Sequence, residues 1–226
     1  MPTREQLWES FCADHRVAES AVLLFEADDN YLARTREIGQ TSKRHVLNRS
    51  PEMESLITRE TERLVEDWKS GKHEFDGLIY MMFWNRTGKV VPLYIGKTET
   101  VGKGQNNLSA NIANLAGDKG KFARWGDNYA YHIGDLSAAV LPGHPEAKAA
   151  EKYKAWAKAL FETTGTESPK LREPVYFWTK AWRRSAVGIW GDFGPTRLTF
   201  LEYLLIGVAS AVFPDTLLNR EGRNRM

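Results

Sequence analysis

The chain has 226 residues, of which 42% are hydrophobic and 27% charged, the ordinary composition of a soluble globular protein. A chain of this length can bury a core without disulfides, and its single cysteine, Cys12, excludes an internal disulfide and a Cys/His metal finger. The net charge of +2 does not by itself indicate a nucleic-acid binder.

Residues 1–70 are predicted to form a helical N-terminal extension. Apolar residues recur at helical spacing over residues 3–38. Ser50 followed by Pro51 is typical of an N-cap and a first helical position. We expect this second helix to run to about Lys69 and to end at the glycine that follows.

Residues 71–226 form the second predicted unit, in which the pattern changes to β at Gly77. Apolar runs at 78–84 and 89–96 flank the turn sequence NRTG, which predicts a β-hairpin. The later elements are expected to be a polar loop over 97–107, a helix over 108–117, a strand over 129–137, a helix over 150–162, a strand over 174–182, and a helix with a proline-led turn over 196–219. This order favours an α+β fold with an antiparallel sheet over alternating βαβ units.

The charges are distributed unevenly along the chain. Acidic residues are frequent over residues 1–76, and basic clusters follow later as KTETVGKGQ, GDKGKFARW, TKAWRR and NREGRNR. This asymmetry predicts a basic face on the second part of the chain. The first residues lack the apolar run of a signal peptide, and the longest apolar run, residues 201–213, is too short to span a bilayer. With a single cysteine, these features lead us to expect a cytoplasmic protein without a membrane partner.

The sequence LYIGKT, residues 93–98, ends in Gly-Lys-Thr, the tail of a phosphate-binding P-loop. A P-loop also needs a glycine five positions before the Gly-Lys pair, where this chain has Val91. The intervening VPLYI is strand-like and contains a proline, so it cannot supply a nest of backbone N–H groups for a phosphate. The motif therefore argues against a nucleotide-binding protein.

The same hairpin carries LIY at residues 78–80 and YIG at 94–96, which resemble the two tripeptides that name the GIY-YIG nuclease superfamily. Leu78 stands where the family has its first glycine, and Gly77 precedes it. The residues that follow in the family's order are Arg124, Glu202, Pro214 and Asn219. The resemblance covers about residues 75–220. It implies a small antiparallel sheet flanked by helices, enlarged here by an insertion around 138–172.

Two features depart from the family pattern. Arg124 lies 30 residues after Tyr94, whereas the family's arginine usually follows closely and often begins an R-x-x-x-H helix. Asn128 stands four residues after Arg124, and the nearest histidine is His132, in a predicted strand. Whether Arg124 or His132 fills the family position is left open. Lys97 is similar to a lysine of a subset of restriction enzymes in this family.

The resemblance implies a catalytic group made of Tyr80, Tyr94, Lys97, Arg124, Glu202 and Asn219. An ordinary tyrosine, with a pKa of about 10, is a poor base at neutral pH. A nearby Lys97 would favour the phenolate or polarise the attacking water. Arg124 would contact phosphate oxygens, and Glu202 would be the metal ligand for one hard divalent ion per site, Mg²⁺ or Mn²⁺. Asn219 would orient part of the site.

Each of these residues also has a purely structural explanation. The tyrosines fit ordinary strand aromatics, Lys97 and Arg124 fit surface cations, and Asn219 fits a turn. Glu202 fits the third position of a capping box begun by Thr199. The helix around Glu202 is nevertheless apolar on nearly every side, where an unpaired carboxylate would be costly.

The stretch 176–190 interleaves tryptophans with basic residues. Trp182, Arg183 and Arg184 are predicted to bind nucleic acid, because aromatic rings stack on bases and cations contact phosphates. The alternative is a half-buried strand with a cationic outer face.

The sequence thus predicts a metal-dependent endonuclease that hydrolyses phosphodiester bonds in DNA, with restriction or defence as the suggested setting and repair as another. The alternative is a catalytically inactive nucleic-acid-binding protein on the same fold, which the replaced first glycine and the displaced arginine keep open. The target site, the strandedness and the choice between monomer and homodimer are not defined by the sequence.

Overall fold

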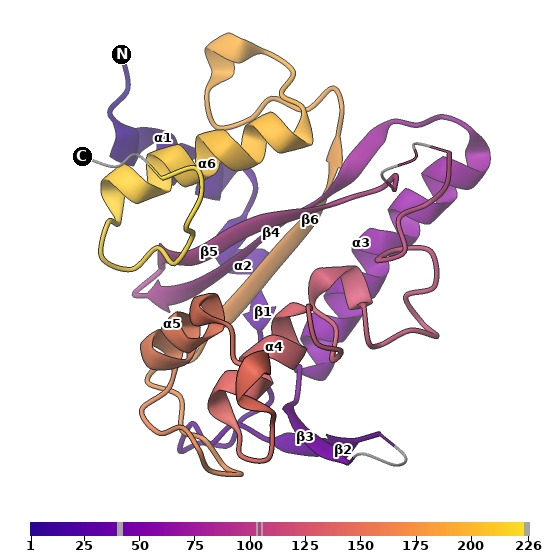
Figure 1. Cartoon of the computed structure of the whole chain (residues 1–226). Coiled ribbons are helices and arrows are strands. Elements are labelled where there is room, and N and C mark those ends of the chain that lie inside the picture. The colour runs from indigo at the N-terminus through magenta and orange to yellow at the C-terminus, as the bar shows by residue number, and fades with distance from the viewer. Residues whose placement is uncertain (40–42, 103, 105, 224–226) are drawn as a thin grey trace.

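The computed structural model describes residues 1–39, 43–102, 104 and 106–223. Helices and strands form a mixed α+β fold around a four-stranded antiparallel sheet (Figure 1). The strand order across this sheet is β1 (Val22–Leu23), β6 (Tyr176–Arg183), β4 (Phe75–Arg86) and β5 (Lys89–Glu99). The predicted α+β class with an antiparallel sheet is therefore confirmed.

The remaining elements precede, join and cover these strands. A separate hairpin consists of β2 (Thr35–Ile38) and β3 (Arg44–Leu47). The helices are α1 (Arg4–Asp14), α2 (Val17–Ser20), α3 (Pro51–Ser70), α4 (His132–Val140), α5 (Glu151–Leu160) and α6 (Leu198–Val212). The short 3-10 turns are η1 (Phe122–Arg124), η2 (Glu146–Lys148) and η3 (Gly191–Phe193).

Helices lie on both faces of the sheet, with α1 and α6 on one face and α3, α4 and α5 on the other (Figure 1). Successive side chains of β4 point alternately into the two cores. Ile79 and Met81 belong to the core under α1 and α6, whereas Leu78, Tyr80 and Met82 belong to the opposite core. This period of two is expected for a strand that is buried on both faces. The C-terminal segment lies beside the edge strand β5, where the Leu218 N–H donates to the Leu93 carbonyl at 2.7 Å.

The predicted hairpin is confirmed as β4 and β5. Tyr80 pairs with Gly96 and Met82 pairs with Tyr94, so the two tyrosines share one face. The next pair joins Phe83 to Pro92, which leaves one extra residue in β5 as a bulge.

Close packing explains Gly96 of the second tripeptide and Gly77, which precedes the first. A Cβ at Gly96 would lie 2.6 Å from a ring carbon of Tyr80, so only glycine lets that ring lie flat on β5. Gly77 has φ +153°, and a Cβ there would lie 2.1 Å from the carbonyl oxygen of Thr98. The register of β4 against β6 shifts between Phe75 and Gly77.

Residues 1–70 are helical only in part. Helix α3 begins as predicted, with the Ser50 hydroxyl accepting the Met53 N–H at 3.0 Å, and it ends at Gly71. The helix expected through residue 38 is wrong, because α1 and α2 are followed by β1, which pairs with β6. Asp28 contributes to this break, since its carboxylate accepts two backbone N–H groups in a turn. Residues 1–70 are thus joined to the sheet through β1.

Two other expectations are wrong. Residues 108–117 form turns and no helix, and residues 129–137 contain the start of α4 in place of a strand. The Asp135 carboxylate accepts the Ala130 N–H at 2.7 Å, which organises the turn that leads into α4. A short apolar run does not distinguish a buried helix from a strand by its period. The predicted elements at 150–162, 174–182 and 196–219 correspond to α5, β6 and α6.

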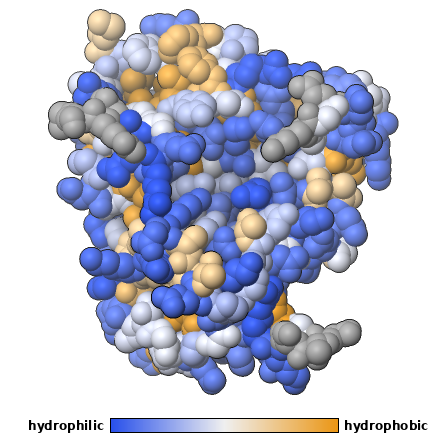
Figure 2. Space-filling view, viewed as in Figure 1, coloured by the Kyte–Doolittle hydropathy of each residue, from blue (hydrophilic) through white to orange (hydrophobic). Residues whose placement is uncertain are grey.

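Within the described ranges, none of the helices combines the length and apolarity that crossing a bilayer demands. The face seen in Figure 2 is mainly hydrophilic, with apolar atoms gathered at the top of the view. Exposed aromatic side chains near α6 are Trp190, Phe193, Phe200 and Tyr203.

Candidate active site

The two hairpin tyrosines lie together, with ring centroids 6.3 Å apart. Tyr80 is buried, whereas Tyr94 is half-buried and lines a cleft of about 400 Å³ at the edge of the sheet. Burial holds the pKa of Tyr80 well above its usual range. Burial and the charge of Glu202 raise the pKa of Tyr94 to about 12, against the opposing charge of Arg124. Both hydroxyls are therefore protonated at neutral pH.

His132, the first residue of α4, connects two buried hydroxyls. Its Nε2 lies 3.2 Å from the Tyr80 hydroxyl, and its Nδ1 lies 2.8 Å from the hydroxyl of Tyr153 on α5. Burial and the charges of Lys152 and Arg124 hold the pKa of His132 well below its usual range. A neutral imidazole donates from one nitrogen and accepts at the other, so His132 links the tyrosines without adding charge.

Arg124 lies on an unusual turn. Phe122, Ala123 and Arg124 have φ values of +29°, +49° and +76°, three successive non-glycine residues in the left-handed region. Such conformations persist only where the surroundings enforce them. Here the Thr98 hydroxyl donates to the Ala123 carbonyl at 3.0 Å, and the Ala123 N–H donates to the carbonyl of Asn111 at 2.9 Å. The strain is consistent with a side chain that must be directed to a particular place.

The charge of Arg124 acts on the tyrosine–histidine cluster. It lowers the pKa values of Tyr80, Tyr94 and His132, although burial determines the net direction at each tyrosine. The guanidinium also lies 5.2 Å from the ring centroid of Tyr131. Among the described residues, no carboxylate forms an ion pair with Arg124. Both Arg124 and His132 therefore act on the tyrosines. His132 does so by its hydrogen bond to Tyr80, and Arg124 does so through its charge.

Glu202 faces the cleft from α6. The helix begins at Leu198 with Arg197 as the N-cap, and the Arg197 side chain makes no capping hydrogen bond. The capping-box explanation is therefore wrong, because the hydroxyl of Thr199 instead donates to Glu99 at 3.4 Å. Burial raises the pKa of Glu202 to about 7, and the charge of Lys97 only partly opposes this.

Lys97 and Asn219 flank this group. Lys97 donates to the Glu99 carboxylate at 2.5 Å, and its side chain is 19% exposed. Asn219 is buried, and its amide pairs with both backbone groups of Ile95, accepting the N–H at 3.0 Å and donating to the carbonyl at 2.8 Å. Both amide atoms are thus used by the strand. Asn219 holds the backbone beside Tyr94, and it also lines the cleft.

Lys152 is a site residue that the sequence analysis missed. It comes from α5, and its Nζ donates to the Tyr94 hydroxyl at 3.2 Å. The cleft is lined by Tyr94, Lys152, Glu202, Tyr203, Ile206, Asn219, Arg220 and Glu221. Nothing in the helical sequence AEKYKAW distinguishes Lys152 from the solvent-exposed Lys154, because only tertiary packing brings α5 against β5.

The predicted nucleic-acid-binding stretch lies elsewhere. Trp182 is 1% exposed, and its indole N–H donates to the Thr196 carbonyl at 2.7 Å, so its ring belongs to the core and offers no face to a base. Arg183 pairs with Glu74, and Arg184 pairs with Asp76 at 3.1 Å. These arginines are exposed, yet each already has a carboxylate partner.

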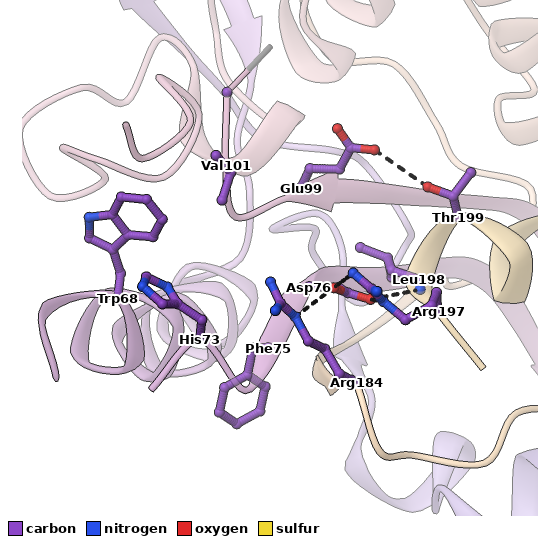
Figure 3. Close-up of a pocket in the computed structure, with 11 residues that line it drawn as sticks. Trp68, His73, Phe75, Asp76, Glu99, Val101, Arg184, Arg197, Leu198 and Thr199 are labelled. Atoms are coloured by element: carbon purple, nitrogen blue, oxygen red, sulfur yellow. Dashed lines mark hydrogen bonds and ion pairs between the residues drawn. The ribbon is translucent and has the colours of Figure 1, made fainter. Parts of the chain in front are cut away.

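Asp76 is the centre of a second cavity, of about 520 Å³ (Figure 3). Arg197 donates to its carboxylate through two nitrogens, at 2.6 and 2.7 Å, and the Leu198 N–H donates at 3.2 Å. Together with Arg184, these contacts join the start of α6 to β4 and the end of β6. Figure 3 shows both arginines turned toward Asp76. The Asp76–Arg184–Arg197 cluster is therefore a structural junction.

Comparison of the chain with family models, with curated proteins and with solved structures finds no match.

Proposed function

We propose that this protein is a metal-dependent endonuclease that hydrolyses phosphodiester bonds in DNA. The observation that carries the proposal is that charged and polar side chains from separate elements come together. Tyr94, Lys152 and Glu202 come from three separate elements and line one cleft, and the charge of Arg124 acts on Tyr94 and Lys152. Perturbed ionisable groups gathered in a concave site are the usual marks of a reaction centre.

The charges suit a phosphodiester substrate. Arg124 has no ion-pair partner in the described part of the chain, so a phosphate could receive hydrogen bonds from it, and Lys152 adds positive charge beside Tyr94. The guanidinium would bind two phosphate oxygens with its planar fork of donors. Tyr94, which is protonated at neutral pH, would donate to a phosphate oxygen or to the attacking water. Tyr80, His132 and Tyr153 form the buried support behind Tyr94.

Glu202 fits a hard divalent cation. Mg²⁺ is commonly held by one or two carboxylates, with waters and substrate phosphate oxygens completing its shell. Glu202 and Glu221 both line the cleft, and no group of three or more His, Cys, Asp or Glu side chains that could hold a metal occurs among the described residues. This donor set suits an ion shared with substrate better than a closed structural site. When bound, such an ion would neutralise charge on the phosphate and the leaving oxygen.

The path of the polynucleotide is suggested by a neighbouring groove. A groove of about 930 Å³ shares Asn219 and Arg220 with the cleft, and Arg4 and Arg223 also line it. Cations along such a groove would bind the backbone on one side of the scissile phosphate. This surface replaces the Trp182 stretch as the favoured contact. Restriction or defence is the proposed setting, on the resemblance of Lys97 alone.

A nucleic-acid-binding protein that does not cleave is the second candidate. The raised pKa values of both tyrosines favour it, since neither hydroxyl is prepared to act as a base. The two candidates are separated by incubating the protein with supercoiled plasmid, linear duplex and single-stranded DNA, each with Mg²⁺, Mn²⁺ or EDTA. The proposed nuclease requires cleavage that depends on the metal. Salt-sensitive binding to the same DNA without any cleavage would establish the second candidate.

A further inference from the structure

Lys152 belongs to a helix that turns its other lysines outward. Helix α5 buries Tyr153, Trp156, Ala157 and Leu160 in the core below the sheet. Lys154 is exposed and pairs with Glu151 at 2.8 Å. Lys152 instead extends inward, with its Nζ 4.4 Å from the ring centroid of Tyr94 and 5.0 Å from that of Trp156. Cation–π contacts partly stabilise an ammonium in such a place.

The surroundings of Lys152 are otherwise unfavourable for a charge. Burial and the charge of Arg124 lower the pKa of Lys152 to about 8, and Asp135 only partly opposes them. No ion pair joins Lys152 to a carboxylate among the described residues. A half-buried cation without a paired anion lowers the stability of the fold. A stability role does not explain its position, whereas a role in the cleft does.

The direction of one hydrogen bond shows what that role can be. An ammonium group donates and cannot accept, so the Tyr94 oxygen must be the acceptor of the 3.2 Å bond with Lys152. The hydroxyl hydrogen of Tyr94 then has to point away from Lys152. Tyr94 and Glu202 line the same cleft, so this hydrogen is free to turn into it.

We propose that Lys152 is a positioning residue for Tyr94, and that it fixes the Tyr94 hydroxyl as a hydrogen-bond donor to a phosphate oxygen of the DNA strand in the cleft. The inference rests on the proposed function, since it names a group of that same site. The inference gives α5 a part in the reaction. This helix lies in the insertion around residues 138–172 that enlarges the expected family module. Without Lys152 the hydroxyl hydrogen can also point away from the phosphate, and the Tyr94 oxygen loses the bond from an ammonium that makes its O–H a stronger donor.

The test is a double-mutant cycle between Lys152→Met and Tyr94→Phe, read as single-turnover cleavage of duplex DNA in Mg²⁺ with protein in excess. Methionine keeps an unbranched chain over the rings but removes the charge and the donor. We expect Lys152→Met to slow cleavage by about 10- to 100-fold when Tyr94 is present, and to have little further effect in the Tyr94→Phe protein, since coupled residues are not additive. Lys154→Met is the matched control on the same helix, and we expect it to cleave like the unsubstituted protein.

Two further measurements separate positioning from folding. The melting temperature of Lys152→Met should stay equal or rise, because a half-buried charge is removed. Lys152→Arg, which keeps a charged donor, should recover part of the lost rate. Full activity of Lys152→Met, or an equal loss in both Tyr94 backgrounds, overturns the inference while the nuclease proposal stands. Absence of metal-dependent cleavage by the unsubstituted protein overturns the nuclease proposal and this inference together.

Discussion

Two groups of charged side chains lie along α6, and the pKa of the central carboxyl group is shifted in opposite directions in the two groups. In the Asp76–Arg184–Arg197 cluster, burial opposes ionisation of Asp76, but hydrogen bonds from Arg197 and Leu198 and the two arginine charges outweigh it and lower the Asp76 pKa. In the cleft a turn further along, burial prevails and raises the pKa of Glu202 to about 7. The first group is complete within the protein. In the second group, no ion pair joins Glu202 or Lys152 to another side chain among the described residues, which is what distinguishes it from a structural junction.

A large effect is expected at Arg124, whose removal would take a guanidinium away from the tyrosine–histidine cluster. Arg124→Ala should slow DNA cleavage by roughly 10²- to 10³-fold, because a fixed donor to the transition state is lost. Arg124→Gly should be equally slow. The glycine protein should nevertheless be more stable than the alanine protein by about 1 kcal/mol, since φ +76° suits glycine. Urea unfolding of both variants measures this difference, and a more stable alanine variant would refute the strained turn.

A smaller effect is expected at the Asp76–Arg184–Arg197 cluster, and it should appear in stability alone. Asp76→Asn removes the charge that both arginines share and should lower the free energy of unfolding by about 1–2 kcal/mol, discounted because the arginines are half-exposed. Glu74→Gln, which loses only the exposed pair with Arg183, is the matched control and should cost less. Cleavage per folded molecule should be unchanged in both variants. Loss of cleavage in Asp76→Asn would move the functional site toward this cluster.

A third expected effect is a pH dependence of stability caused by Glu202. Its folded pKa of about 7 exceeds the ordinary value of 4.5, so its contribution to stability is present below pH 4.5 and is lost as the pH rises through 7. Glu202→Gln cannot ionise. In EDTA, the melting temperature of Glu202→Gln relative to wild type should therefore increase between pH 5 and pH 8. A constant difference would mean that Glu202 is well solvated in the free protein.

The sequence predicts the parts of this molecule that depend on local pattern. Turn residues and apolar alternation predict the β4–β5 hairpin and hence the shared face of Tyr80 and Tyr94. The Ser50 cap predicts α3. The left-handed turn at Arg124 could not be predicted, because residues distant in the sequence impose it through Thr98 and Asn111.

Tertiary packing also explains the remaining differences between the predicted and the observed site. Lys152 reaches Tyr94 only because α5 folds back onto β5. The spacing of apolar residues within α5 does not predict this contact. Trp182 belongs to the core because its strand is covered by helices on both faces, so the tryptophan-and-arginine pattern does not define a surface. The capping box at Thr199 fails because α6 begins at Leu198, so Thr199 lies inside the helix and its hydroxyl donates to Glu99.

The central claim is that the cleft around Glu202 is where a phosphodiester bond is hydrolysed. The most direct measurement is the rate of plasmid cleavage by the wild-type protein and by Glu202→Gln in the same Mg²⁺ buffer, with the exposed Glu173→Gln as the matched control. Wild type and Glu173→Gln should cleave at the same rate. Glu202→Gln should be slower by roughly a thousandfold while remaining folded, since a neutral amide is a poor ligand for a hard cation. Cleavage by Glu202→Gln at the wild-type rate would contradict the account.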